Sequence, residues 1–406
     1  MELLLIVIAA ELVVYGIVRF TRHHFPWMIT PLDEEPCIDA QALIKFMEQG
    51  FDPELGWIRK PSTEKDEKGK WGTTHYRIDK DGSRADPGHE NLETLVSAYG
   101  DSFAFGRQVN DNEVWTWHLA EKTKTHVLNF AVGNYGLDQS YLRLQREHPK
   151  HKTPIVIIGV VPSTIIRVLS LWKHYNEFGN TFASKPMFYL KNDALELISN
   201  RLDTQEKFLT LQEHLSYFRE HDYFYQRFFR KEMIRFPYLL HFFKHPYRNI
   251  RLVLLTLYAL LFENEEKKST QIYGTPMKVI MERNLNLRVD LFMNDPYANK
   301  LLTMLVGEFA AFAERARFTP VLVLLPQKDD VNYIQRHGKY YKHFLQTIQQ
   351  IPHLHVLDFL DTILSHFNIS ALYSDDNKYG GHLSLEGNTL LANAIYGFLK
   401  NKKLIS

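Results

Sequence analysis

Two residues far apart in the chain, Ser102 and His382, have the types and settings that nucleophilic catalysis needs. Ser102 ends the tripeptide Gly100-Asp101-Ser102 directly after an apolar run, and His382 follows two glycines ahead of an apolar C-terminal segment. A serine hydroxyl becomes an effective nucleophile when a base such as histidine lies within hydrogen-bond reach. These residue types would suit nucleophilic catalysis if the fold brought the two side chains together.

Each of these residues also has an ordinary structural interpretation. A lone Gly-Asp-Ser tripeptide is most often a turn whose serine caps the following helix. His382 is one of 19 histidines, and a loop histidine most often lies at the surface. Short motifs of this kind indicate function only in the right structural context. The hypothesis therefore requires a fold that brings residues 102 and 382 together.

Short apolar runs alternate with helical patterns on both sides of a long central stretch, which is typical of βαβ units and a parallel sheet. In open parallel sheets, ligands bind at the carboxyl ends of the strands. Ser102, Asn134 and Ser163 each follow a predicted strand, and His382 precedes the last helix, so we expect them at one edge. The predicted strands are 93–99, 125–132, 154–161, 320–325 and 355–359, and the predicted helices are 114–122, 139–147, 298–316, 340–351 and 385–399.

Three segments carry motifs in a fixed order along the chain: 100–106 (GDSFAFG), 127–139 (VLNFAVGNYGLDQ) and 379–388 (YGGHLSLEGN), supported by 51–57 and by Lys185-Pro186. Together they resemble the motif blocks of the SGNH/GDSL hydrolase family, in particular its membrane-anchored bacterial esterases and O-acyltransferases. The resemblance extends over most of 93–170 and 298–400. It implies an α/β fold of three layers with a central parallel sheet, a long mainly helical insertion and an N-terminal transmembrane helix.

The resemblance assigns roles to particular residues. It implies that Ser102 attacks an acyl carbonyl while His382 takes its proton. The oxyanion would be held by the backbone N–H of Ser102 and by those of the Gly133–Asn134 turn, each worth about 3 kcal/mol. Asn134 occupies the position of the family's usual glycine. A backbone N–H suffices there, and Asn accepts unusual loop dihedrals better than most residues.

Two positions depart from the family pattern. The third block normally supplies an asparagine, which residues 159–164 lack, so the hydroxyl of Ser163 or Thr164 replaces it or simply caps a helix. The acid normally found three residues before the histidine is replaced by Tyr379. Asp375 or Asp376 is then the candidate acid, unless a backbone carbonyl orients His382. Removing the acid of such a site costs about four orders of magnitude in rate.

The chain begins with an apolar run from Leu3 to Phe20 that just reaches the length of a membrane-spanning helix, about 20 residues. We expect an uncleaved single-pass anchor over 1–22, with a buried N-terminal helix as the alternative. Glu11 lies within this run and needs a partner in lipid. The family resemblance favours an extracytoplasmic catalytic domain, whereas Arg19 and Arg22 on the C-terminal flank favour a cytoplasmic one.

The remaining organisation follows from the same patterns. We expect a lead-in segment at 23–92 that packs on the main domain, and a catalytic domain at 93–406 interrupted by a mainly helical insertion at about 172–297. Within the insertion, 250–262 is strongly apolar but too short to span a bilayer. We interpret it as a core helix, with a helix lying on the membrane as the alternative.

Composition narrows the function classes. With 45% hydrophobic and 23% charged residues the chain is globular, and a net charge of +1 makes nucleic acid a poor partner. Cys37 is the only cysteine, which excludes an internal disulfide, and the histidines show no metal-ligand spacing, so neither a metal nor another cofactor is expected. The family resemblance predicts an esterase or O-acyltransferase, and the expected anchor and insertion favour a carbohydrate or lipid-linked acyl ester at a membrane as its substrate. The alternative is a catalytically degenerate member serving as a binding subunit for a membrane protein partner.

Overall fold

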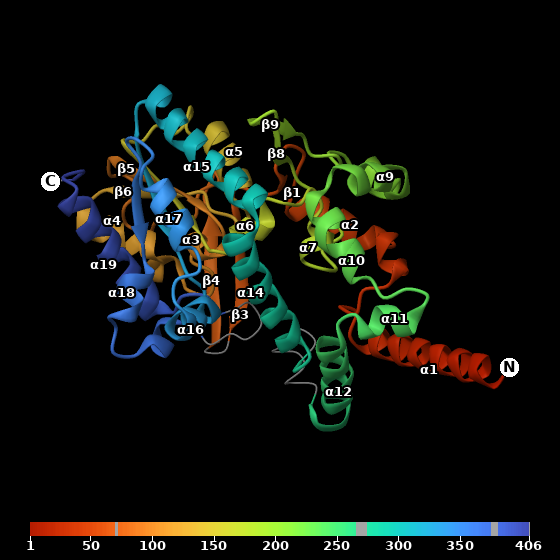
Figure 1. Cartoon of the computed structure of the whole chain (residues 1–406). Coiled ribbons are helices and arrows are strands. Elements are labelled where there is room, and N and C mark those ends of the chain that lie inside the picture. Colours follow the sequence, from red (N-terminus) through yellow and green to blue (C-terminus); the bar gives the residue numbers. More distant parts are fainter. Residues whose placement is uncertain (70–71, 265–273, 375–380, 406) are drawn as a thin grey trace.

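A five-stranded parallel sheet lies at the centre of the chain (Figure 1). The computed structural model describes residues 1–69, 72–264, 274–374 and 381–405. All neighbouring strands of the central sheet pair in parallel, in the spatial order β11-β10-β7-β5-β6. The predicted α/β fold with a central parallel sheet is confirmed. The strands are β5 (Thr94–Gly100), β6 (His126–Asn129), β7 (Ile155–Val160), β10 (Thr319–Leu324) and β11 (His355–Asp358).

Helices cover both faces of this sheet and complete three layers. On one side α4 (Trp115–Thr123) contacts β6 and α19 (Leu385–Asn401), and on the other α5 (Leu137–Glu147) and α15 (Pro296–Ala316) contact each other and the strands (Figure 1). Every residue of β7 is buried, as expected for a parallel strand covered on both faces. Smaller helices of this part are α3 (Ser102–Phe105), η2 (Asp111–Glu113), α16 (Lys328–His337), α17 (Lys342–Ile348), α18 (Leu360–Leu364) and η4 (Ile369–Leu372).

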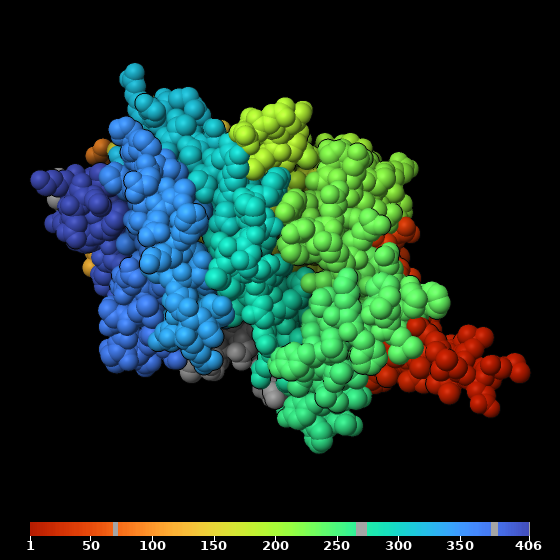
Figure 2. Space-filling model, viewed as in Figure 1, coloured from red at the N-terminus to blue at the C-terminus, as the bar shows by residue number. Residues whose placement is uncertain are grey.

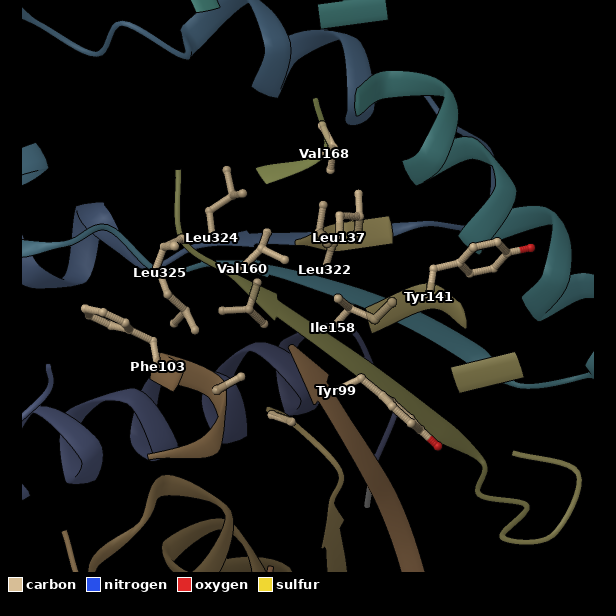
Figure 3. Packing of buried hydrophobic residues seen from close by; sticks show 14 of the residues in the cluster. Tyr99, Phe103, Leu137, Tyr141, Ile158, Val160, Val168, Leu322, Leu324 and Leu325 are labelled. Atoms are coloured by element: carbon tan, nitrogen blue, oxygen red, sulfur yellow. The ribbon is translucent and has the colours of Figure 1, made fainter. Parts of the chain in front are cut away.

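The core between sheet and helices is built from branched aliphatic and aromatic side chains. Figure 3 shows Ile158 and Val160 of β7 close to Leu322 and Leu324 of β10, with Tyr141 of α5 beyond them. All of these side chains are buried in one hydrophobic cluster. Such a continuous core fixes the register of the strands, and it therefore fixes the positions of the loops that follow them.

The order of the strands reverses between β5 and β7. The chain leaves β5 for β6 on one side and then crosses back to β7 on the other side of β5. Ligands bind outside the carboxyl ends of strands at such a reversal. Gly100 and Gly159 pair at this end of β5 and β7, so the segments that follow both strands begin side by side.

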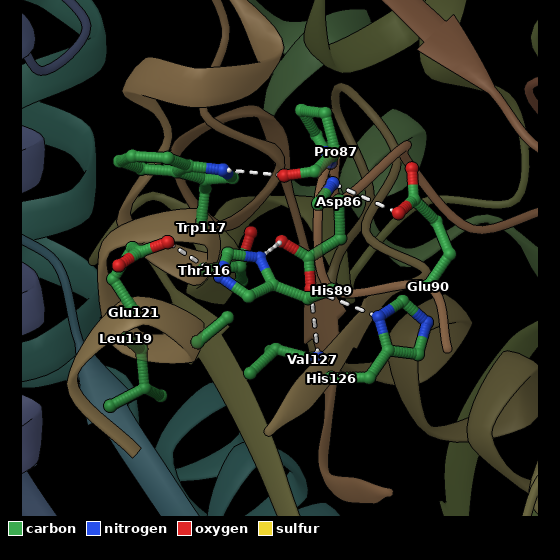
Figure 4. Close-up of polar contacts among 12 residues, drawn as sticks. Asp86, Pro87, His89, Glu90, Thr116, Trp117, Leu119, Glu121, His126 and Val127 are labelled. Atoms are coloured by element: carbon green, nitrogen blue, oxygen red, sulfur yellow. Dashed lines mark hydrogen bonds and ion pairs between the residues drawn. The ribbon is translucent and has the colours of Figure 1, made fainter. Parts of the chain in front are cut away.

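The lead-in segment contains two hairpins that the sequence analysis did not predict. The hairpin of β3 and β4 escaped prediction because the sequence of β3, TEKDEKG, has no apolar alternation. The segment is joined to the sheet by Asp86, whose carboxylate accepts from the N–H of Val127 at 3.0 Å (Figure 4). The elements are η1 (Pro31–Glu34), α2 (Ala40–Gln49), β1 (Phe51–Asp52), β2 (Gly56–Trp57), β3 (Thr63–Gly69) and β4 (Gly72–Ile78).

The stretch between β7 and β10 is mainly helical in the described residues and also holds one antiparallel hairpin, β8–β9. The hairpin was not predicted, since its short strands lie next to helical patterns. Most of the helices of this stretch lie on the right-hand side of the molecule in Figure 1, whereas α6 and α14 lie near its centre. The elements are α6 (Thr164–Arg167), α7 (Lys173–Asn176), β8 (Met187–Lys191), β9 (Ala194–Ile198), α8 (Gln205–Leu209), α9 (Leu211–His221), η3 (Tyr225–Phe229), α10 (Arg230–Glu232), α11 (Tyr238–Phe243), α12 (Pro246–Phe262) and α14 (Met277–Asn294).

Two apolar helices lie away from the central core. Among the described residues α1 (Glu2–His24) is the helix that is long and apolar enough to span a membrane, a property that a signal sequence shares. Helix α12 was expected to be a core helix, and this expectation is wrong. Only Asn249, Leu252, Thr256 and Ala259 of α12 are buried, while most of its large apolar side chains are exposed.

Candidate active site

Ser102 and His382 meet at the carboxyl end of β5. The Nε2 atom of His382 lies 2.8 Å from the Oγ atom of Ser102, a hydrogen-bond distance. The two residues are 6% and 3% exposed, and the ring of Phe103 lies against the imidazole with a centroid distance of 4.8 Å. The histidine is therefore not a surface residue. The pair has the geometry required for a serine activated by a base.

Glycine and aspartate in the Gly100-Asp101-Ser102 tripeptide have separate structural roles. Gly100 has a φ of +144°, and a Cβ atom there would lie 2.1 Å from the carbonyl oxygen of Gly159, so only glycine fits. Asp101 caps α3 by accepting from the N–H of Phe103 at 2.8 Å, and its other oxygen accepts from the N–H of Val161 at 3.0 Å. Asp101, rather than Ser102, is thus the cap, which leaves the Ser102 hydroxyl for His382.

Arg167 holds the same aspartate from the opposite side. Its Nη1 donates to Asp101 at 3.2 Å and to the carbonyl of Tyr135 at 2.9 Å. Burial raises the pKa of the Asp101 carboxyl, and the positive charge of Arg167 opposes that rise. Arg167 consequently ties together the segments that follow β5 and β6.

The electrostatic environment of His382 keeps its imidazole neutral. Burial lowers the pKa of His382 well below its ordinary value, and the nearby positive charges of Arg107 and Arg167 lower it further. A neutral imidazole can accept a proton at Nε2, whereas a protonated one cannot. The site thus favours the form of the histidine that a general base requires.

The Gly133–Asn134 turn lies beside Ser102, as the family resemblance implies. Val132 donates its N–H to the carbonyl of Gly100 at 3.0 Å, and a Cβ atom on Gly133 would lie 3.9 Å from the Cβ of Ser102. Asn134 adopts a left-handed conformation with φ of +69°, which asparagine tolerates better than most residues. The turn therefore has the conformation that a glycine would favour at this position.

Trp57 of the lead-in segment contacts the Gly133–Asn134 turn by a hydrogen bond and the adjacent Tyr135 by a ring contact. Its indole Nε1 donates to the carbonyl oxygen of Gly133 at 3.0 Å, and its ring meets the ring of Tyr135 edge to face. In a trans peptide the carbonyl of Gly133 and the N–H of Asn134 point in opposite directions. Holding the carbonyl toward Trp57 thus directs the Asn134 N–H away from the indole.

Ser163 and Thr164, the two hydroxyls predicted near the oxyanion, have different environments. Thr164 Oγ1 accepts from the N–H of Leu137 at 2.9 Å and so is engaged in the structure. Ser163 stands at the start of α6 but makes no capping hydrogen bond, and its buried Oγ has no hydrogen-bond partner among the described residues. Ser163 also lines the same cleft as Ser102 and His382.

The predicted acids are not placed by the structure. Asp375, Asp376 and Tyr379 lie outside the described residues. Asp358, the last residue of β11, accepts from the N–H of Leu360 at 3.1 Å at the start of α18. Within the described ranges, no group of three or more His, Cys, Asp and Glu side chains is arranged to hold a metal ion.

The serine and histidine open into a cleft of about 490 Å³, within the range of small-molecule sites. Its walls combine a cationic region near the pair with amide side chains from the insertion and a few apolar residues from α14 and from the end of α1. The lining includes Trp27, Phe103, Arg107, Asn134, Ser163, Arg167, Asn176, Asn180, Met277, Met281, Asn284 and Gln327.

Sequence reasoning missed the residues that support the site from other segments. Trp57 and Arg167 stand in sequences with no motif of their own, so no local signal pointed to a role. The carboxylate of Asp138, in the first turn of α5, forms a buried ion pair with the ammonium of Lys185. Lys185 was named only as part of the family resemblance. A single sequence contains no pattern that predicts a pairing between residues 138 and 185.

No family model matches the chain, and no curated protein matches it. Similar solved structures include a putative lipolytic protein of the G-D-S-L family from Desulfitobacterium hafniense DCB-2, which is 16% identical, with coverage of 76% of this chain and 100% of that chain and a TM-score of 0.35. The psychrotrophic esterase EstA from Pseudoalteromonas sp. is 11% identical, covering 76% and 97%, with a TM-score of 0.36. A lipase/acylhydrolase from Enterococcus faecalis is 12% identical, covering 77% and 97%, with a TM-score of 0.35.

Proposed function

We propose that the chain is a membrane-anchored serine esterase or O-acyltransferase of the SGNH type. The observation that carries the proposal is the 2.8 Å contact between Ser102 Oγ and His382 Nε2 at the switch point of a parallel sheet, inside a cleft. A serine on a strand-to-helix turn and a neutral, buried histidine within hydrogen-bond reach are what acyl transfer requires. Helix α1 would hold the chain in the membrane.

The reaction would proceed in two balanced steps. In the first, Ser102 Oγ bonds to the acyl carbon as its proton passes to His382 Nε2, and the alkoxy group then leaves as an alcohol with that proton. In the second, water or another hydroxyl attacks the acyl-serine, gives its proton to His382, and Ser102 recovers its proton as the new acid or ester departs. Water as acceptor makes the chain an esterase, and a sugar hydroxyl makes it an O-acyltransferase.

The developing oxyanion would be stabilised by donors from three segments of the chain. The backbone N–H of Ser102 lies at the start of α3, and those of the Gly133–Asn134 turn lie next to it. The hydroxyl of Ser163 would supply the donor that the family usually takes from an asparagine. Its lack of a hydrogen-bond partner in the described part of the chain supports this role, because a buried hydroxyl without a partner is costly unless a ligand uses it.

The cleft favours a polar acyl ester. Amide side chains of Asn176, Asn180 and Asn284 and the guanidinium groups of Arg107 and Arg167 line it and suit the many oxygen atoms of a carbohydrate. Trp27 and the methionines Met277 and Met281 provide an apolar wall on the side of α1. We infer that an acylated carbohydrate or a lipid-linked sugar is the substrate class.

Labelling with a fluorophosphonate probe tests the proposal. The full chain should become labelled, and Ser102→Ala and His382→Ala should remove the label, because the probe reacts with an activated serine. Ser370→Ala, which changes an exposed serine outside the cleft, serves as the control and should label like the native chain. A folded native chain that takes no label would refute the enzyme and leave the alternative, a binding subunit of a membrane assembly.

A further inference from the structure

The helices α11 and α12 form an apolar surface continuous with α1. Both helices contact α1 and each other, and their inner residues share one hydrophobic cluster with Val14 and Val18 of α1. Figure 2 shows α1 projecting from the body with the green segment that holds α11 and α12 directly beside its base. We call the outward side chains of α11 and α12 the apolar platform. They are Leu240, Phe243, Tyr247, Ile250, Leu254, Leu257, Tyr258, Leu260, Leu261 and Phe262, all exposed.

Helix α12 is apolar on its exposed face as well as on much of its buried face. Its exposed apolar residues recur at helical spacing from Tyr247 to Leu261, and no charged residue follows Arg251 within the helix. The buried residues are two apolar ones, Leu252 and Ala259, and two polar ones, Asn249 and Thr256. A surface helix in water carries charged and polar residues on its outward face. The outward face of α12 is therefore suited to an apolar medium.

Glu11 shows how deep this surface lies along α1. Its carboxylate accepts from the N–H groups of Tyr238 and Leu239 at 2.7 and 3.3 Å, at the start of α11. An ionised carboxylate within an apolar helix is costly in lipid unless it is paired, and these two donors supply the pairing. Because Glu11 lies in the middle of α1, α11 must lie at the depth of the apolar part of α1.

We propose that the apolar platform lies in the lipid bilayer beside α1. Continuity with the candidate membrane helix, the exposed apolar face of α12 and the pairing of Glu11 all point to lipid as the occupant. The uncharged apolar part of α12, residues 252–262, is too short to span a bilayer, and the helix runs at a large angle to α1 in Figure 1, so it enters the bilayer beside α1 without crossing it.

The platform also places the proposed active site at the membrane surface. Trp27 lines the cleft of Ser102 and His382 and also a small cavity that Leu252 of α12 helps to enclose. Met277 lines the cleft and packs against the cluster shared by α1 and α12. The apolar wall of the cleft therefore continues toward the bilayer. This consequence rests on the proposed function, whereas the insertion of the platform does not.

Site-directed spin labelling of the full chain tests the insertion without any reference to activity. In a Cys37→Ser background, the single variants Leu254→Cys and Leu261→Cys place labels on the platform, since Leu261 is 73% exposed. Phe367→Cys is the matched control, an apolar residue that is 93% exposed and follows α18, on the side of the molecule away from α1 in Figure 1. Leu4→Cys reports on α1 itself. The chains are reconstituted in vesicles of phosphatidylcholine and phosphatidylglycerol.

Collision with oxygen, which concentrates in lipid, is compared with collision with a water-soluble nickel chelate. Labels at 254 and 261 should collide more with oxygen, as in lipid, and the label at 367 should collide more with nickel. Platform labels as accessible to nickel as the control would overturn the proposal, and labels shielded from both reagents would overturn it by showing a protein cover. Water exposure at Leu4→Cys would refute the α1 anchor separately, and the fluorophosphonate result is independent of all these outcomes.

Discussion

Replacing Trp57 by phenylalanine should slow catalysis although Trp57 does not touch the reacting atoms. The change keeps an aromatic ring against Tyr135 and removes the Nε1–H that donates to Gly133 at 3.0 Å. Without that donor the Gly133–Asn134 peptide is free to rotate, and its N–H is no longer held in one direction. Trp57 is thus a positioning residue for the proposed oxyanion site.

The size of the effect follows from the hydrogen bond that is lost. A hydrogen bond of this kind contributes about 0.5–1.5 kcal/mol, and Trp57 is only half-buried, so about 1 kcal/mol is expected for stability. One oxyanion donor is worth about 3 kcal/mol in the transition state, which sets the upper limit. We expect kcat/KM to fall by a factor between about 5 and 100, mostly through kcat, because oxyanion donors act on the transition state.

The chain offers a closely matched control in Trp117 (Figure 4). Its Nε1 also donates to a backbone carbonyl, that of Pro87, at 3.0 Å, and its ring meets the ring of His89 edge to face. Trp117 is half-buried like Trp57, and it lies outside the cleft. Trp117→Phe should therefore lose a similar amount of stability with no change in turnover.

Hydrolysis of p-nitrophenyl acetate and urea unfolding, measured on native chain and both variants, separate the two effects. The expected result is similar loss of unfolding free energy in both variants and a fall in kcat in Trp57→Phe alone. Equal kcat values for Trp57→Phe and the native chain would refute the positioning role. A fall of the same size in Trp117→Phe would show that general destabilisation, and not the Gly133 carbonyl, controls the rate.

The remaining predictions concern the base, the hydroxyl and the glycine of the site. The folded-state pKa of His382 is lowered, so kcat/KM should stay on its plateau as pH falls through 6.5, and a midpoint of the kcat/KM profile at or above 6.5 would contradict this. The free energy of unfolding should fall below pH 6.5, because there only the unfolded chain takes up a proton at His382. Ser163→Ala should lower kcat by about 10²-fold with unchanged urea stability, and a change within twofold would exclude Ser163 as an oxyanion donor. Gly100→Ala should destabilise the fold by about 2–6 kcal/mol, because the new Cβ atom clashes with Gly159 and the backbone is strained. The control Gly307→Ala, at an open position inside α15, should stabilise the fold by up to about 1 kcal/mol. Equal melting temperatures for these two variants would contradict the close approach of β5 to β7.

Local apolar runs predicted the sheet, and the family resemblance predicted which serine and which histidine would meet at its edge. Continuous apolar runs such as that of β7 identify strands buried on both faces, and the position of a residue just after such a strand predicts the edge where it lies. The hairpin of β3 and β4 carried no such pattern, since its residues are mostly polar. Helix α12 was misinterpreted because apolar composition alone does not say whether the apolar face points to a core or to lipid.

The site depends on contacts that no local pattern encodes. Trp57, 76 residues away from Gly133, approaches it through the folding of the lead-in segment, and Arg167 joins Asp101 to the loop after β6 through space. These contacts make the proposed oxyanion turn depend on three separate parts of the chain. Covering the sheet would not require the lead-in segment to donate a hydrogen bond to the carbonyl of Gly133 beside Ser102. The position of Trp57 therefore favours a lead-in segment that helps to shape the active site. The comparison of Trp57→Phe with Trp117→Phe measures this contribution.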